Sequence, residues 1–305
     1  MEKIRVRFLE KKEQVPLPVG VKMLPESWQK IYIEKRKPFR LEGDTAILHT
    51  TAENSRTSPW RNNAVKLLEA LKKKGVSVII SPAEGDLPRE ILPFADGRRL
   101  TNLFAFQGAR EALKRQGKQP EECRYLLAGG NEAAWRAALV SMGNEVNHLS
   151  IFTADVGEAK KLEQELFAEW GLLAEVFASL KNPVFQEADV VFGCGMEQRK
   201  YEYMLKEGAV WIDLAGNRPV LRKLTEKRPD VTAVDGFFFR KGKKQLEGRS
   251  AEAEAFLSCP AFRENWERIP TGNAGKEMLC ELQEMGYGLS GFSLMEKRVK
   301  IRRKP

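Results

Sequence analysis

The sequence is poor in the residues that build metal sites and disulfide frameworks. Its 305 residues include four cysteines and two histidines. The cysteines are scattered without the short spacings of a zinc site, which argues against zinc and favours a reducing compartment. We therefore expect no metal and a cytoplasmic protein. The four thiols are Cys123, Cys194, Cys259 and Cys280.

Long apolar runs are also absent. No stretch reaches the roughly 18 apolar residues of a membrane span. The first residues, MEKIRVRFLEKKEQ, are charged from residue 2 and lack the apolar core of a secretory signal. Hydrophobic residues make up 42% and charged residues 30% of the sequence, as in a soluble globular protein. We expect about two domains and no membrane partner.

Positive charge is in excess, with a formal net charge of +9. Part of it comes from residues 297–304, which carry six cations next to a single acid, Glu296. Such a segment is typical of a nucleic-acid-binding arm or of a solvated tail. No aromatic RNA-binding signature accompanies it, so the solvated tail is favoured and nucleic acid is not the expected partner.

The segment Arg124–Ala138, RYLLAGGNEAAWRAA, has the pattern of a strand, a glycine turn and a helix. A tight turn lets the backbone approach a pyrophosphate, and the helix N-terminus offers N–H groups to it. The usual G-x-G-x-x-G/A pattern is matched except at its first position, and Glu132 would repel a phosphate. A strand–turn–helix that binds nothing stays an alternative. The positions of the pattern are Ala128, Gly129, Gly130, Asn131 and Ala133.

Strands and helices alternate regularly from this segment onward. Apolar strands such as VVF and AVWI predict a parallel sheet that is covered on both faces. We therefore expect a doubly wound parallel sheet. Its strands are predicted over 124–128, 148–153, 174–178, 189–193, 209–214 and 231–235. Its helices are predicted over 132–142, 156–170, 197–207 and 220–226.

Two further regions flank this sheet. Residues 1–108 are predicted as an α/β domain that contains short strands over 4–9 and 30–34. Its βαβ unit has a strand over 45–50, a helix that begins at Pro59 and a strand over 76–81. Residues 109–235 form the sheet domain. Residues 236–305 are predicted to be helical and to fold back onto the first domain, because so short a segment makes a poor core alone.

Several segments resemble, in their order, the shikimate dehydrogenases, glutamyl-tRNA reductases and methylene-tetrahydrofolate dehydrogenases. LLAGGNEAAWRAAL resembles the motif G-A-G-G-A-x-R-A, and IFTADVGEAKKL resembles the second strand with its cofactor turn. ADVVFGCGM resembles D-x-x-x-N-A-T-x-x-G-M, and GAVWIDLAGNRP resembles the fifth-strand segment of the folate enzymes. DGRRLTNLFAFQG stands where the family has D-G-x-x-x-G-x-N-T-D-x-x-G. The resemblance covers residues 50–245 and implies a Rossmann domain that binds NAD or NADP.

The resemblance implies that two segments besides the glycine turn contact the dinucleotide. One is Thr153 with Asp155, which lies 25 residues past Gly130 and would accept hydrogen bonds from a ribose. A helix N-cap is the favoured interpretation of Asp155. NAD is favoured over NADP because Ala154 replaces the arginine that binds a 2′-phosphate. The other segment is Gly193, Cys194, Gly195 and Met196, where the cysteine is favoured as a packing residue over an activated thiol.

The catalytic pair of the shikimate dehydrogenases is absent. Ala105 stands where the N-T-D motif has its aspartate, and Arg61 stands where T-x-P-x-K has its lysine. Arginine stays charged near neutral pH and cannot act as that general acid and base. The reductases' cysteine nucleophile has no counterpart in TAENSR. The catalytic residues are therefore unknown, and we expect no shikimate dehydrogenase activity.

The polar segment after the strand over 45–50 is the best candidate for a substrate site. Guanidinium and hydroxyl groups at a helix start suit a carboxylate or a phosphate. A capping loop on the surface is the alternative. The candidate residues are Asn54, Ser55, Arg56, Thr57 and Arg61.

Two functions stay open. The favoured one is an NAD(P)-dependent oxidoreductase that acts on a small anionic metabolite in a cleft between two domains. The second is a non-catalytic protein that binds a dinucleotide or a metabolite, as a sensor or a partner subunit, and the missing catalytic pair favours it. A methyltransferase is disfavoured because its D-x-G-x-G pattern is missing. The oligomeric state is unknown, and a dimer is compatible with the sequence.

Overall fold

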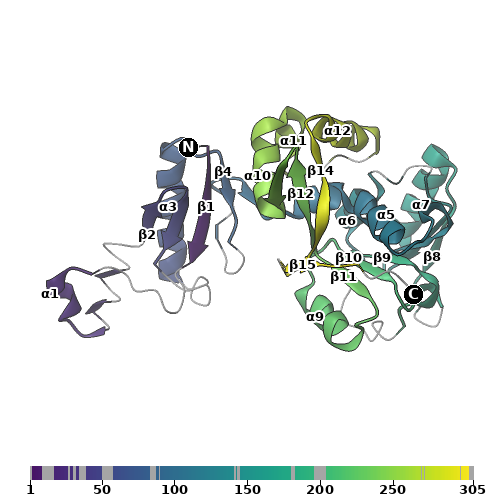
Figure 1. Cartoon of the computed structure of the whole chain (residues 1–305), viewed down its shortest axis with the longest axis horizontal. Coiled ribbons are helices and arrows are strands. Elements are labelled where there is room, and N and C mark those ends of the chain that lie inside the picture. The colour runs from purple at the N-terminus through teal and green to yellow at the C-terminus, as the bar shows by residue number, and fades with distance from the viewer. Residues whose placement is uncertain are drawn as a thin grey trace. The chain divides into compact units, whose positions relative to one another are not determined.

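The structure is a computed structural model of the chain (Figure 1). By Cα proximity the chain divides into two compact units, Met1–Asp96 with Glu252–Trp266 and Gly97–Ala251 with Glu267–Pro305. In the described part no helix combines the length and apolar character needed to cross a membrane. The described residues are 2–8, 17–26, 28–29, 32–33, 39–49, 58–82, 87–88, 90–140, 142, 145–179, 183–195, 204–268, 270, 272–295 and 297–301, without the side chains of residues 58 and 59.

The first unit is built on a five-stranded sheet with the order β2-β3-β1-β4-β5. All neighbouring pairs are parallel except β2 with β3. The predicted βαβ unit is present as β3, α3 and β4, whereas residues 32–33 are helical, so the strand predicted over 30–34 is wrong. The elements are β1 (Lys3–Phe8), α1 (Val19–Lys22), β2 (Phe39–Glu42), β3 (Thr45–Leu48), α3 (Ser58–Lys73), β4 (Val78–Ile80) and β5 (Phe94–Ala95).

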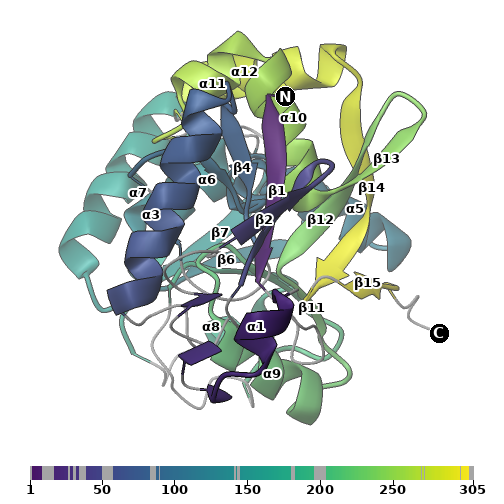
Figure 2. The ribbon, with the colours of Figure 1, turned by 90° about the vertical axis from the view of Figure 1, so that its left-hand side faces the viewer.

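Helix α3 covers one face of this sheet (Figure 2). Ala64, Leu67, Leu68 and Leu71 follow one another at helical spacing and are all buried. They share a hydrophobic core with strand residues such as Ile4. Such an apolar stripe is typical of a helix that packs on a sheet.

The second unit contains a six-stranded sheet with the order β11-β10-β9-β6-β7-β8. Every pair of neighbours is parallel. Numbered along the chain from β6, the order is 3-2-1-4-5-6, which is the doubly wound order of the Rossmann fold. The predicted fold class is confirmed. The strands are β6 (Arg124–Ala128), β7 (His148–Phe152), β8 (Ala174–Phe177), β9 (Val190–Gly193), β10 (Val210–Asp213) and β11 (Thr232–Val234).

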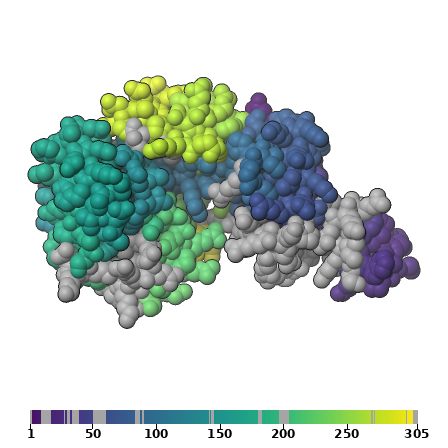
Figure 3. Space-filling view, turned by 180° about the vertical axis from the view of Figure 1, so that it is seen from behind, coloured from purple at the N-terminus to yellow at the C-terminus, as the bar shows by residue number. Residues whose placement is uncertain are grey.

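Helices cover both faces of the six-stranded sheet. On one face, Leu126 and Trp211 share a core with side chains of α8 and α9. On the other, the ring of Tyr125 lies 5.6 Å from that of Phe106 on α5. Helix α7 packs along β8 and forms part of the unit's outer surface (Figure 3). The helices are α4 (Arg98–Leu103), α5 (Ala105–Arg115), η2 (Pro120–Glu122), α6 (Glu132–Leu139), α7 (Val156–Trp170), α8 (Val184–Glu187) and α9 (Arg218–Lys227).

The helical prediction for residues 236–305 misses four strands. They form an antiparallel sheet with the order β13-β12-β14-β15. Phe237 and Phe239 of β12 point into the core, and α5 approaches so closely that a Cβ on Gly108 would lie 2.2 Å from the Phe237 ring. The elements are β12 (Gly236–Lys241), β13 (Lys244–Glu247), α10 (Gly248–Ser258), α11 (Pro260–Glu264), α12 (Gly272–Glu284), β14 (Tyr287–Leu294) and β15 (Lys297–Val299).

Candidate functional site

The carboxyl ends of β6 and β9 meet at the point where the strand order reverses. Ala128 and Gly193 are partners in the register of these strands. The Cys194 N–H donates to the Ala128 carbonyl at 2.6 Å, and the Asn131 N–H donates to the Cys194 carbonyl at 3.0 Å. Two of the predicted cofactor segments are therefore held side by side. In open α/β sheets, ligands bind in the crevice at such a reversal.

The turn between β6 and α6 presents backbone N–H groups at the start of a helix. Gly129 has a φ of +120°, a conformation that side-chain-bearing residues rarely adopt. The Asn131 carboxamide caps α6 by accepting from the Ala134 N–H at 3.2 Å. Among the described residues, none accepts a hydrogen bond from the N–H groups of Gly130, Glu132 or Ala133. Free N–H groups at a helix N-terminus, together with the helix dipole, form an anion site.

The acidic residue at this helix start is paired with a cation. The Arg136 guanidinium contacts Glu132 Oε1 at 2.6 Å and Glu165 Oε2 at 2.9 Å. Hydrogen bonds from Glu165 and Glu132 raise the pKa of Arg136. Both carboxylates remain about half exposed, so water screens their charge as well. The repulsion of a phosphate by Glu132 is therefore weaker than the sequence alone suggests.

The segment after β7 lies next to the glycine turn. Thr153 is buried, and its Oγ1 would lie 3.7 Å from a Cβ on Gly130. The same Oγ1 accepts from the Asp155 N–H at 3.1 Å. The Asp155 carboxylate caps α7 by accepting from the Glu158 N–H at 3.2 Å. The capping interpretation of Asp155 is confirmed, and its contact with a ribose stays a prediction.

Cys194 is a packing residue. It is fully buried, and burial together with the nearby Asp213 carboxylate raises the pKa of its thiol. A thiol of this kind is not a nucleophile near neutral pH, so the activated-thiol interpretation is wrong. Gly195 follows with a φ of +80°. Met196 lies outside the described residues.

Asp213 is a candidate that sequence reasoning missed. It ends β10, is the register partner of Gly193, and is 4% exposed. Burial raises the pKa of Asp213 to about 6, although the N–H groups of Asn217 and Ala215 donate to it. Its Oδ2 has no hydrogen-bond partner among the described residues. The sequence signal for Asp213 was its position directly after the apolar run AVWI.

Arg98 is a second missed residue. It is the first residue of α4. Its positive charge partly opposes the rise in the pKa of Asp213 that burial causes. Its guanidinium lies so close to Gly216 that a Cβ there would be 2.3 Å from Nη2. Gly216 also has a φ of +76°. The loop after β10 thus depends on glycine to bring Arg98 and Asp213 to the same edge of the sheet.

The predicted substrate residues are only partly described. Asn54, Ser55, Arg56 and Thr57 lie outside the described residues. Arg61 lies in the first turn of α3, with its guanidinium 3.6 Å from Glu90 and both side chains 70% exposed.

Ala105 is the residue that the sequence resemblance aligns with a catalytic aspartate. It begins α5 and is fully buried.

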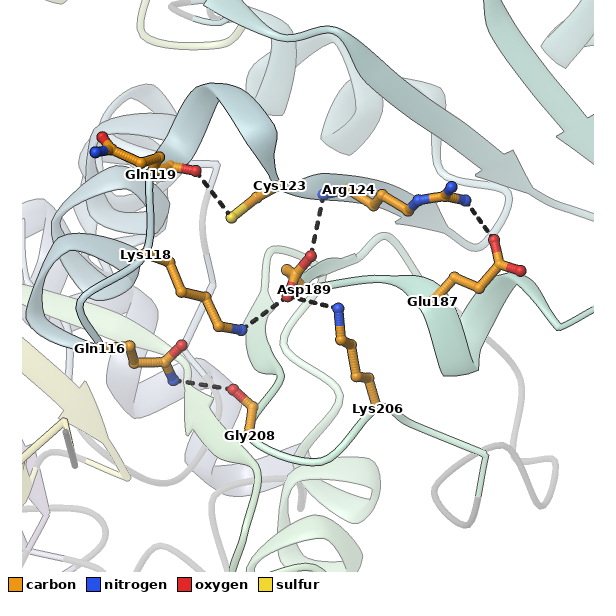
Figure 4. Close-up of polar contacts among 9 residues, drawn as sticks. All are labelled: Gln116, Lys118, Gln119, Cys123, Arg124, Glu187, Asp189, Lys206 and Gly208. Atoms are coloured by element: carbon orange, nitrogen blue, oxygen red, sulfur yellow. Dashed lines mark hydrogen bonds and ion pairs between the residues drawn. The ribbon is translucent and has the colours of Figure 1, made fainter. Parts of the chain in front are cut away.

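A different polar cluster, at the amino ends of the strands, has a structural role (Figure 4). Asp189 accepts from Lys118 Nζ at 2.7 Å, from Lys206 Nζ at 2.9 Å and from the Arg124 N–H at 3.2 Å. Cys123 beside it donates to the Gln119 carbonyl at 3.1 Å, and burial raises the pKa of its thiol to about 11. The cluster is satisfied internally and lies at the edge opposite to the ligand-binding edge of such sheets.

Comparisons with solved structures give matches with low sequence identity and low TM-scores. No family model and no curated protein matches the sequence. A shikimate dehydrogenase from Aquifex aeolicus is 15% identical with a TM-score of 0.37, over 91% of this chain and 97% of that chain. Shikimate 5-dehydrogenase from Listeria monocytogenes, solved with shikimate and NAD, is 14% identical with a TM-score of 0.35, over 91% of this chain and 96% of that chain.

Other matched structures are longer than the shared part. An L-alanine dehydrogenase is 16% identical with a TM-score of 0.30, over 38% of this chain and 37% of that chain. This chain thus spans well under half the length of that structure. Values this low carry no argument about this chain.

Proposed function

We propose that this chain is an oxidoreductase-type Rossmann protein that binds a nicotinamide dinucleotide at the carboxyl ends of β6 and β9. One observation carries the proposal. The two glycine turns meet where the strand order reverses, and the N–H groups of Gly130, Glu132 and Ala133 find no acceptor among the described residues. A pyrophosphate supplies the acceptor oxygens and the negative charge that such a turn favours.

The remaining residues of the edge suit the rest of a dinucleotide. Thr153 and Asp155 stand next to the glycine turn, where an adenosine ribose would bind. Ala154 offers no charge to a 2′-phosphate, which supports NAD over NADP. Gly193 and Asp213 lie on the other side of the reversal, on the strands that the nicotinamide half would reach. The bound nicotinamide would supply hydride chemistry, while these residues would bind and orient it.

The same proposal includes the chemical class of the substrate. A small anionic metabolite is the class that Arg56 and Arg61 suit, because guanidinium groups hold carboxylates by charge-assisted hydrogen bonds. The exposed position of Arg61 leaves it accessible to such a ligand.

A non-catalytic dinucleotide- or metabolite-binding protein is the second candidate function. The observation that favours it is the fully buried methyl group of Ala105 at the position where the family has its aspartate. Turnover would need another proton donor. Asp213, with a pKa raised by burial to about 6, is a titratable group at the correct edge.

A thermal-shift titration tests dinucleotide binding. NAD, NADP, NADH, NADPH and S-adenosylmethionine are added in turn, and a ligand at 100 times its dissociation constant should stabilise the protein by about 2.7 kcal/mol. Gly130→Asp places a carboxylate in the turn and should abolish this shift. Gly20→Asp is the matched control. Gly20, like Gly130, has no positive φ, and no atom lies within 4 Å of its Cβ position.

The outcomes separate the two functions. A shift with a nicotinamide dinucleotide that Gly130→Asp removes supports the binding site. Oxidation or reduction of a small carboxylic acid by the bound cofactor then supports the oxidoreductase, and binding without turnover across a panel of such acids supports the sensor. No shift with any dinucleotide contradicts the oxidoreductase and the dinucleotide-binding form of the second function.

A further inference from the structure

A guanidinium and a carboxyl group from distant parts of the sequence act on each other at the carboxyl end of β10. Arg98 begins α4, and Asp213 ends β10. The positive charge of Arg98 partly opposes the rise in the pKa of Asp213 that burial causes. Asp213 is also the register partner of Gly193. The two groups therefore adjoin the part of the sheet edge that the nicotinamide half of the proposed cofactor would reach.

The backbone at Gly216 makes room for the Arg98 guanidinium. A Cβ on Gly216 would lie 2.3 Å from Arg98 Nη2, 2.5 Å from Cζ and 3.0 Å from Nη1. The guanidinium thus occupies the space in which any other residue would carry its side chain. The φ of Gly216, +76°, also favours glycine. The loop after β10 therefore fixes the place of this cation, while Arg98 stays exposed to solvent.

Asp213 holds the same loop in place. Its carboxyl group accepts hydrogen bonds from the N–H groups of Ala215 and Asn217, which flank Gly216. The residue is buried, and its Oδ2 has no hydrogen-bond partner among the described residues. A buried carboxylate oxygen without a donor is costly, so this group takes up a proton more readily than an exposed aspartate does.

Charged and titratable groups on the neighbouring elements act on the Asp213 carboxyl group. They include Arg98 at the start of α4, Asp235 after β11 and Cys194 after β9. Cys194 is a neutral thiol, because burial raises its pKa. The Asp235 carboxylate accepts from the Met295 N–H at 2.8 Å, and its charge adds to the effect of burial on Asp213. Burial and this charge bring the pKa of Asp213 to about 6.

This combination of charges suits a monovalent anion. A guanidinium binds a carboxylate by paired, charge-assisted hydrogen bonds. The nearby carboxylates of Asp213 and Asp235 repel an anion at Arg98, and they repel a divalent anion about twice as strongly as a monovalent one. A carboxylate is therefore favoured over a sulfate or phosphate dianion. A proton on Asp213 removes part of this repulsion.

We propose that Arg98, lying against Gly216, binds the carboxylate of the small anionic metabolite, and that protonation of Asp213 strengthens this binding. Arg98 contacts the ligand in this assignment. Asp213 is a positioning residue, which acts through its charge and through the loop that holds Arg98. The inference rests on the proposed function only in treating this anion as the substrate. The anion site itself can be measured without a dinucleotide.

Carbon-13 NMR of the full chain, with labelled aspartate carboxyl groups, tests the proposal. The probe is lactate, whose single carboxylate stays ionised above about pH 5, and sulfate is the divalent comparison. Asp213→Asn identifies the signal of Asp213, which should titrate near pH 6. Lactate should raise the pKa read from this signal, because a bound anion disfavours the ionised carboxyl group. Sulfate should bind more weakly than lactate.

The affinity for lactate should depend on pH in the reciprocal way. It should rise at least about fivefold as the pH falls from about 8 to about 5, since binding and protonation favour each other equally. Asp213→Asn lacks the charge at every pH. Its affinity at about pH 8 should match that of the wild type at about pH 5, and its pH dependence should disappear.

Variants of Arg98 test the contact itself. Arg98→Ala should weaken lactate binding at least about tenfold, because a charge-assisted hydrogen-bonded pair is lost. Arg222→Ala removes another exposed arginine of the same unit, on α9, and should stay within about twofold. If Arg98→Ala does not fold, Arg98→Lys decides. It keeps the charge but loses the guanidinium fork, so it should also weaken lactate binding.

Several results would overturn the proposal. They are a pKa of Asp213 that lactate leaves unchanged, sulfate binding as tight as lactate binding, and equal losses in Arg98→Ala and Arg222→Ala. Failure of the proposed function gives a different pattern. Dinucleotide binding that depends on Gly130, together with no lactate effect, contradicts this inference alone. A lactate effect without dinucleotide binding supports the anion site and contradicts the proposed function.

Discussion

Asp189 offers the sharpest test of what stabilises the six-stranded sheet. Its carboxylate is 6% exposed and receives three hydrogen bonds, two of them from the lysine ammonium groups of Lys118 and Lys206. Asp189→Asn removes the charge and keeps the shape. Breaking a buried ion pair costs about 3–5 kcal/mol. The lysine side chains are 22% and 39% exposed and regain water, so we expect a loss of about 2–3 kcal/mol at pH 7.

The same group predicts a dependence of stability on pH. Burial alone would raise the pKa of Asp189, but hydrogen bonds from Lys118, Lys206 and the Arg124 N–H lower it below its ordinary value of 3.8. Because the folded pKa is the lower one, the stabilisation is complete above the ordinary value and is lost as the pH falls through the folded value. The free energy of unfolding of Asp189→Asn should therefore fall less than that of the wild type as the pH is lowered below about 4.

Urea unfolding at a series of pH values measures both effects. Glu187→Gln is the control, because Glu187 forms an exposed ion pair with Arg124 in which both side chains are about half exposed. An exposed pair contributes about 0–1 kcal/mol. If Asp189→Asn costs no more than Glu187→Gln, the Asp189 cluster does not stabilise the sheet and the reasoning fails.

Three further outcomes follow from burial and close packing. Iodoacetamide should modify the exposed Cys280 in the native protein and the buried Cys194 only after unfolding, which mass spectrometry of the alkylated peptides checks. Gly108→Ala should lower stability by about 1–3 kcal/mol in thermal unfolding, because the new methyl group meets the Phe237 ring; an unchanged melting temperature would contradict the packing. Asp213 has a pKa raised to about 6, so its protonated form stabilises the fold below the ordinary value and this contribution is lost as the pH rises through about 6. Asp213→Asn should flatten the stability profile between about pH 4 and pH 6 in urea titrations, and a profile that keeps its slope would refute this.

Elements with strong local signals were predictable from the sequence. Helix α7 runs from Val156 to Trp170, as predicted, because Asp155 caps its start and Gly171, with a φ of +65°, ends it. Strand β6 likewise matches its predicted bounds. The doubly wound parallel sheet followed from the apolar character of its strands and from the regular helical crossovers between them.

Non-local pairing was the part that the sequence did not reveal. Strands β12 and β14 pair across about fifty residues, and the signal for β12 is the run Phe237–Phe239 followed by a turn at Gly242, whose φ is +58°. The sequence FFFRKGKKQLE thus had the features of a hairpin. Asp213 was missed for a related reason, because its place beside Gly193 depends on the register of β9 and β10. The helix predicted over 197–207 is not present in its described part, 204–207.

Amide hydrogen exchange tests the proposed dinucleotide site most directly. The N–H groups of Gly130, Glu132 and Ala133 have no acceptor among the described residues, so they should exchange rapidly in the free protein. Saturating NADH or NADPH should slow exchange at these three amides, and the effect should be absent in Gly130→Asp. Unchanged exchange at all three amides, under conditions where a dinucleotide raises the melting temperature, would show that the cofactor binds elsewhere and would contradict the proposed site.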